Sequence, residues 1–157
     1  HALASDPKVL IADEPTTSLD VTIQAGIIDL LIRLKEERNL SIIFITHNLA
    51  LISGIADRIV VMYGGLVMEQ GPTPEVLEAP RHPYTRALLN SILDLGQHYT
   101  DTPITAVAGT VPDPYSPEPG CPFAPRCPLA EAACREEVPG FMEDGHPHRC
   151  RFPGVKE

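Results

Sequence analysis

The stretch Val9-Leu10-Ile11-Ala12-Asp13-Glu14-Pro15 decides the fold of this chain, because an apolar run ends there in two adjacent carboxylates. The apolar residues predict a short buried strand, and the proline stops that strand from continuing. Successive side chains of a strand point to opposite faces, so Asp13 and Glu14 are expected to serve different partners. Ligands of open α/β sheets bind beyond the carboxyl ends of parallel strands, which makes this pair the first candidate site.

Helix and strand patterns alternate after this stretch. Asp20 is placed to cap an amphipathic helix over residues 21–38, with apolar side chains that include Ile23 and Leu30 recurring near the helical period. Residues 41–46 are almost entirely apolar, as is typical of a parallel strand covered on both faces, and His47 follows directly. The alternation predicts an α/β fold.

The pattern of the sequence changes in the later part of the chain. We expect a short helix over 48–56, a β-hairpin of residues 58–63 and 66–70 turning at Gly64-Gly65, and helices from Thr73 and over 86–95. Most of the 17 prolines lie near or beyond residue 95, where the apolar periodicity ends. The expected parts are therefore a main domain over residues 1–95, a proline-rich linker over 96–120 and a small cysteine-rich module over 121–157.

The composition narrows the class of partner. The formal net charge is -9 and the isoelectric point is near 5.0, whereas binding to nucleic acid requires clustered Lys and Arg. No stretch approaches the roughly 18 consecutive apolar residues that span a bilayer, and no signal-peptide pattern is visible. We therefore expect a soluble acidic protein that does not bind nucleic acid.

The order of Asp13-Glu14, Asp20, a second strand and His47 resembles the second half of an ATP-binding cassette (ABC) ATPase domain. The resemblance implies the C-terminal half of an ABC-type (RecA-like) nucleotide-binding domain, with parallel strands, helices and a β-hairpin, followed by the Cys/Pro-rich module. It implies that Asp13 holds Mg²⁺ and that Glu14 is the general base for the attacking water. It also implies that His47 contacts the γ-phosphate of ATP and that Asp20 communicates across an ATPase dimer.

Each of these residues also has a structural explanation. The acids alone could form a solvated turn, Asp20 could be only a helix cap, and His47 could be an ordinary surface residue. Their joint spacing favours the site. No Gly-x-x-x-x-Gly-Lys-Ser/Thr loop and no glycine-rich signature motif occurs, so these residues resemble a C-terminal half and are expected not to hydrolyse ATP alone.

Motifs in the second half of the chain narrow the family. They are Gly71-Pro72-Thr73-Pro74-Glu75-Val76, His82-Pro83-Tyr84-Thr85-Arg86, and Cys121-Pro122-Phe123 with Arg126-Cys127-Pro128. They resemble the dipeptide/oligopeptide (and nickel) branch of ABC importers. The His-Pro-Tyr segment itself is expected to begin a helix whose tyrosine packs in the core, or to form a docking surface for the tail or for a partner subunit.

The resemblance to this branch implies the function. It implies an ATP-hydrolysing subunit that drives uptake of dipeptides or oligopeptides, with a nickel importer or a non-transport ABC ATPase as alternatives. The implied partners are a second ABC ATPase subunit, identical or paralogous, the membrane permease subunits and, indirectly, an extracytoplasmic binding protein. The implied location is the cytoplasmic face of the membrane, as a peripheral protein.

Four cysteines, Cys121, Cys127, Cys134 and Cys150, form a further candidate site, spaced C-x5-C-x6-C-x15-C. Structural zinc sites usually contain closer pairs, whereas looser spacing with adjacent prolines suits an iron–sulfur cluster. The resemblance also implies a [4Fe-4S] cluster here. Zinc, with His146 or His148 as substitute ligands, and free thiols or disulfides remain alternatives.

Overall fold

The computed structural model describes residues 3–17, 19–91, 109, 110, 113, 115, 119–143 and 145–154. These residues form two compact units, His1–Leu49 and Ala50–Glu157. Both units mix helices with strands, which confirms the predicted α/β class. The expected boundary near residue 95 falls inside the second unit, beside residues 92–108, which lie outside the described part.

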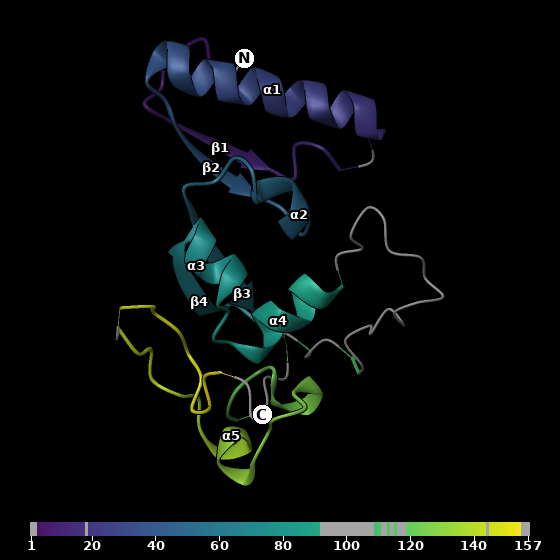
Figure 1. The fold of residues 1–157 in the computed structure, drawn as a ribbon, viewed down its shortest axis with the longest axis vertical. Helices are drawn as coiled ribbons and strands as arrows, with labels where there is room; N and C mark the ends of the chain where they lie inside the picture. The colour runs from purple at the N-terminus through teal and green to yellow at the C-terminus, as the bar shows by residue number, and fades with distance from the viewer. Residues whose placement is uncertain are drawn as a thin grey trace. The chain divides into compact units, whose positions relative to one another are not determined.

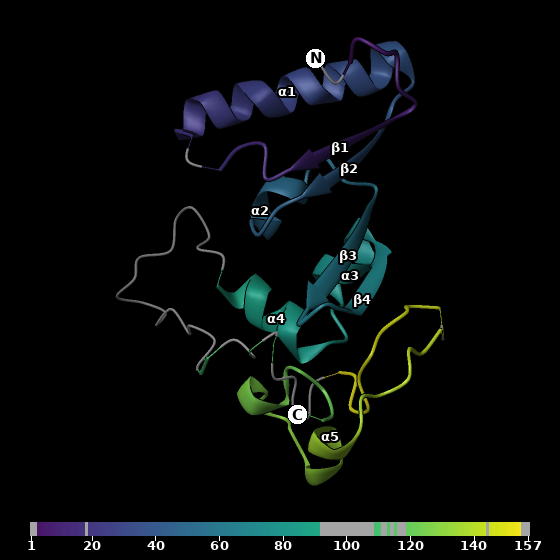
Figure 2. The same ribbon diagram turned by 180° about the vertical axis from the view of Figure 1, so that it is seen from behind.

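The first unit is built on two parallel strands. β1 (Val9–Asp13) pairs with β2 (Ser41–Ile45) in a register that sets Asp13 opposite Ile45. The helix α1 (Val21–Arg38) lies over one face of the pair in both views (Figures 1 and 2). The opposite face carries side chains that are 47–63% exposed, namely those of Val9, Ile11, Ile43 and Ile45.

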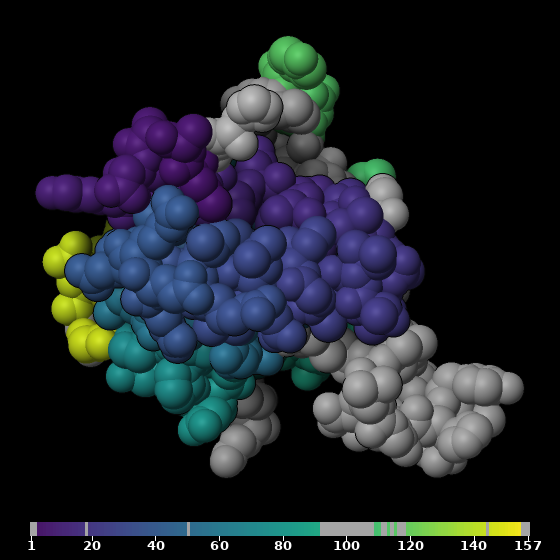
Figure 3. Space-filling view, turned by 90° about the horizontal axis from the view of Figure 1, so that it is seen from above, coloured from purple at the N-terminus to yellow at the C-terminus, as the bar shows by residue number. Residues whose placement is uncertain are grey.

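The ends of α1 agree with the sequence, but its buried stripe does not. Oδ1 of Asp20 accepts a hydrogen bond from the backbone N–H of Ile23 at 2.9 Å, which satisfies one of the free donors of the first turn. Ile28 is the buried residue of the helix, whereas Ile23 and Leu30 are half exposed. The predicted stripe was wrong at these two positions, because the helix turns Ile28 rather than Leu30 inward. Figure 3 looks onto the outer surface of α1.

The second unit begins with an antiparallel hairpin. β3 (Arg58–Tyr63) and β4 (Leu66–Pro72) are joined by Gly64 and Gly65, whose φ angles are +55° and +78°. Positive φ at both positions is what a two-residue hairpin turn requires, and glycine adopts it without steric cost.

Three helices accompany the hairpin in the chain. α2 (Leu49–Ile52) is shorter than the predicted 48–56, and α3 (Thr73–Glu78) begins at the expected threonine. α4 (Pro83–Asn90) starts three residues earlier than predicted, because His82 rather than a later residue caps it. Residues 92–95 of the predicted helix lie outside the described residues.

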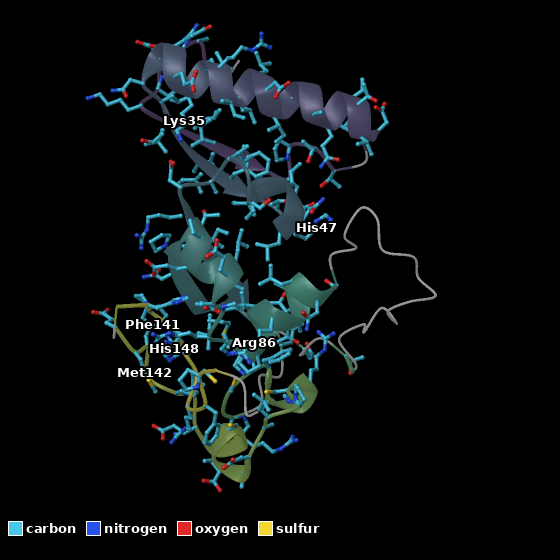
Figure 4. The ribbon with its side chains drawn as sticks, in the orientation of Figure 1. Lys35, His47, Arg86, Phe141, Met142 and His148 are labelled. Carbon is cyan, nitrogen blue, oxygen red and sulfur yellow. The ribbon has the colours of Figure 1, made fainter. Side chains whose placement is uncertain are left out.

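The C-terminal residues continue the hairpin as an added edge. The N–H of Gln70 donates to the carbonyl of Pro147 at 2.9 Å, and the N–H of Arg149 donates to the carbonyl of Met68 at 2.7 Å. His148 bridges to Glu69 on one side and to Met142 on the other (Figure 4). The outer edge of β4 is therefore covered by the tail rather than left as a row of unpaired donors and acceptors.

The core of the second unit joins the tail to the hairpin. Tyr63, Met68 and Phe123 are buried together, and the rings of Tyr63 and Tyr84 each stack at an angle on that of Phe123, with centroids 5.3 and 5.2 Å away. Tyr84 thus packs in the core, as one interpretation of the His-Pro-Tyr segment expected. The ring of Tyr84 also contacts Phe123 of the tail, which agrees with the other interpretation, a docking surface for the tail.

The tail itself is short of regular structure. It contains the 3-10 turn η1 (Ala124–Arg126) and the helix α5 (Ala132–Glu136). Gly120 has φ of +89°, and a Cβ there would lie 2.4 Å from the carbonyl oxygen of Cys134. Glycine is required at that position because the two tail segments touch backbone to backbone. None of the helices among the described residues has the length and apolarity needed to cross a bilayer.

Candidate functional site

Glu14 and His47 meet at the carboxyl edge of the parallel strand pair. The N–H of Glu14 donates to the carbonyl of Ile45 at 2.9 Å, so the pairing of β1 with β2 continues one residue beyond Asp13. The chain then turns, with φ of +45° at Glu14, a left-handed conformation that is uncommon for a side-chain-bearing residue. Such backbone strain is concentrated at functional sites, and Pro15 follows it.

Both oxygens of the Glu14 carboxylate are engaged. Oε1 lies 3.1 Å from Nδ1 of His47, and Oε2 accepts a hydrogen bond of 2.8 Å from the hydroxyl of Thr17. These two hydrogen bonds, His47 first and then Thr17, hold the pKa of Glu14 below its ordinary value, so the carboxylate is ionised at neutral pH. The side chains of Glu14 and His47 are 45% and 74% exposed, so a ligand can reach them. Figure 4 marks His47 in the loop between β2 and α2.

The two other predicted acids have different surroundings. Asp13 ends β1 with an exposed side chain, and its carboxylate forms no hydrogen bond or ion pair within the described part of the chain. It is therefore open to a cation. Asp20 caps α1 through its side chain, which is the structural role that its position before the helix also predicted.

Thr17 was not predicted from the sequence. A hydroxyl three residues after a carboxylate is within reach when the chain turns between them, so the spacing could have indicated it. The turn is present, because the N–H of Thr17 donates to the carbonyl of Glu14 at 3.2 Å.

The four cysteines line a common pocket in the second unit. Cys121, Cys127, Cys134 and Cys150 share it with His82, Phe123 and Arg149. Burial raises the pKa of Cys121 and Cys127, and raises that of Cys150 to about 11. As free groups these three would be protonated and weakly reactive thiols at neutral pH.

The cysteine pocket contains thiol groups of the kind that bind metals. Four cysteine side chains around one pocket match the donor set of an iron–sulfur cluster in kind and number. Among the described residues, no group of three or more His, Cys, Asp or Glu side chains is placed to hold one metal ion.

Glu69 is a buried acid that the sequence did not single out. Its side chain is fully buried, and its two oxygens accept hydrogen bonds from the backbone N–H groups of Arg81 at 2.7 Å and His82 at 2.9 Å. Nε2 of His146, from the tail, lies 2.8 Å from Oε1 of the same carboxylate. Glu69 therefore ties the start of α4 and the tail to β4.

His82 is a neutral helix cap. Its Nδ1 accepts a hydrogen bond of 3.0 Å from the N–H of Tyr84, and Pro83 occupies the first helical position, where no N–H is needed. Burial, and then the nearby His148 and Arg86, lower the pKa of His82 to about 4. The imidazole therefore carries no charge at neutral pH.

Comparison with known proteins shows which proteins the chain is similar to. Residues 68–134 match the C-terminal region of oligopeptide/dipeptide transporters. The chain is 46% identical over 154 residues to the dipeptide transport ATP-binding protein DppD of Escherichia coli (strain K12), covering 97% of this chain and 46% of that protein. It is 44% identical over 151 residues to DppD of Bacillus subtilis (strain 168), covering 95% and 44%. The chain thus spans about half the length of these relatives, and the resemblance to ATP-binding subunits of peptide importers is confirmed.

Proposed function

We propose that this chain, a relative of the ATP-binding subunits of peptide importers, forms the C-terminal part of an ABC-type domain that hydrolyses ATP to drive peptide uptake. The observation that carries the proposal is the ionised Glu14 carboxylate held against His47 at the carboxyl edge of β1 and β2. Peptides are favoured over nickel as the substrate, because both relatives named above are dipeptide transporters. The reaction is ATP + H₂O → ADP + phosphate.

In this mechanism Glu14 is the general base. Its ionised carboxylate accepts a proton from the water that attacks the γ-phosphate, and it is exposed enough for that water to reach it. Asp13, with its open carboxylate, would hold Mg²⁺, and the ion would supply positive charge beside the phosphate oxygens. These 157 residues contain no P-loop, so other residues hold the phosphates, and this part of the domain is expected to be inactive alone.

His47 has two nitrogens with separate tasks. While Nδ1 faces Glu14, Nε2 is free to face the γ-phosphate, and it can donate a hydrogen bond there when it carries a proton. Asp20 lies in the loop that leads into α1, and we assign it contact with a second ATPase subunit across the dimer. The remaining partners are the permease subunits, which would hold the protein at the cytoplasmic face of the membrane.

Replacement of the proposed base tests this assignment. Glu14→Gln keeps the size of the side chain and removes the proton acceptor, so it should lower kcat for ATP by at least about 100-fold while ATP still binds. Hydrolysis and nucleotide affinity are measured in the full-length subunit assembled with its partners. Asp29→Gln, at an exposed position on α1, is the control and should leave hydrolysis unchanged. Wild-type turnover in Glu14→Gln would refute the role of Glu14.

The cysteine pocket is proposed to hold a [4Fe-4S] cluster on Cys121, Cys127, Cys134 and Cys150. The presence of all four cysteines around one pocket supports this ligand set. When bound, the cluster would link tail segments that have little core of their own. Protein purified without oxygen should contain about four irons and four sulfides per chain, and Cys134→Ser should lose them. One zinc per chain, with no sulfide, would show that the site binds zinc and would refute the cluster.

A further inference from the structure

We propose that Thr17 is a positioning residue for the hydrolysis reaction, because its hydroxyl fixes the orientation of the Glu14 carboxylate. The inference rests on the proposed function, in which Glu14 is the base. The hydrogen bond from Oγ1 of Thr17 to Oε2 of Glu14 is 2.8 Å long, which is a normal length for a hydroxyl donating to a charged oxygen.

The Thr17 hydrogen bond is built into the loop. Thr17 is three residues from Glu14, and its N–H donates to the carbonyl of Glu14 at 3.2 Å, so one turn brings the two side chains together. The positive φ of Glu14 directs the chain into that turn. His47, in contrast, comes from a separate segment 33 residues along the chain.

Thr17 and His47, the two partners of Glu14, therefore differ in how firmly they stay beside it. The contact of His47 with Glu14 joins two segments 33 residues apart and is not part of one local turn, so His47 can leave Glu14 when its ring turns toward a phosphate oxygen. Thr17 moves with Glu14 and keeps its hydrogen bond when His47 leaves. A carboxylate has about four lone-pair sites, so Glu14 can accept from Thr17 on one oxygen and from the attacking water on the other.

A fixed orientation matters because a base must lie within hydrogen-bond reach of the proton that it removes. The Glu14 side chain is 45% exposed, so packing restrains it only in part. One donor hydrogen bond is then the main restraint on rotation of the carboxylate. Removing it leaves the base present but loosely placed, which lowers turnover without changing nucleotide binding.

The test compares two substitutions in the full-length subunit assembled with its partners. Thr17→Val removes the hydroxyl at nearly constant shape, and kcat should fall about tenfold with KM for ATP unchanged, as is typical when a supporting hydrogen bond is lost. Thr17→Ser keeps the hydroxyl and should restore most of kcat. Thr16→Val is the matched control in the same loop, because the described residues include no hydrogen bond from Thr16 to Glu14.

The split between kcat and KM gives a readout that a general loss of structure would not move. A loosely placed base lowers kcat and leaves KM for ATP unchanged, and the hydroxyl of Thr17→Ser should restore the same hydrogen bond to Oε2 of Glu14.

The outcomes distinguish this inference from the proposed function. If Thr17→Val keeps the wild-type kcat while Glu14→Gln is inactive, Thr17 does not position the base and the ATPase assignment stands. A Thr17→Ser variant as impaired as Thr17→Val would equally show that the hydroxyl does not position the base. If Glu14→Gln is active, the proposed function itself fails.

Discussion

At the scale of single residues, Glu69 is a buried acid that joins three segments of the second unit. A carboxylate with no solvent exposure is costly to bury unless its oxygens are hydrogen-bonded, and Glu69 has two backbone donors and His146 around it. Those partners come from the start of α4 and from the tail. The contacts that offset the cost of burying Glu69 therefore also join β4, the start of α4 and the tail.

Glu69→Gln should therefore destabilise the protein by about 3 kcal/mol. The amide has one acceptor oxygen for two backbone donors, and its NH₂ would face a donor N–H instead of an acceptor. Urea unfolding measures the loss, and a double-mutant cycle with His146→Ala measures how much of it comes from the tail. Glu78→Gln, on the exposed side of α3, is the matched control and should change stability by less than about 0.5 kcal/mol. Equal stability of the two variants would show that the Glu69 contacts contribute nothing.

At the scale of elements, local chemistry made the helices and strands predictable. The bounds of α1 agree because Asp20 caps one end and Asn39, with φ of +48°, ends the other. The hairpin follows from Gly64-Gly65 in the same way. Pairing between distant segments has no such local signal. The tail edge on β4 depends on residues 146–149 meeting residues more than 70 positions earlier, and no periodicity indicates that contact.

The residues of the candidate sites also differ in whether the sequence could predict them. The proximity of Glu14 and His47 could be expected, because both follow strands that resemble neighbours in a known fold. Thr17 and Glu69 could not be singled out, because each is an ordinary polar residue until a turn or a buried contact gives it partners. The stripe of α1 was misplaced at Ile23 and Leu30, since a helix of mixed apolar faces does not show by sequence alone which face is covered.

At the scale of the whole molecule, the tail and the hairpin share one core. Phe123 from the tail has no exposed surface and contacts the rings of Tyr63 and Tyr84. The sequence predicts a separate module over residues 121–157, whereas these contacts favour one cooperative unit that includes β3, β4, α4 and the tail. The two alternatives differ in what happens to the hairpin when the tail is disturbed.

Phe123→Ala distinguishes these alternatives. Removing this ring should cost about 3–5 kcal/mol, because it leaves a cavity between the tail and β4. In one cooperative unit, backbone amides of β3 and β4 then exchange with solvent faster, together with those of the tail. Hydrogen exchange followed by mass spectrometry resolves the two segments. Phe141→Ala makes the same change at a half-buried tail position beside Arg149, and should affect the hairpin much less. Faster exchange confined to the tail in Phe123→Ala would establish the tail as a module that folds separately from the hairpin.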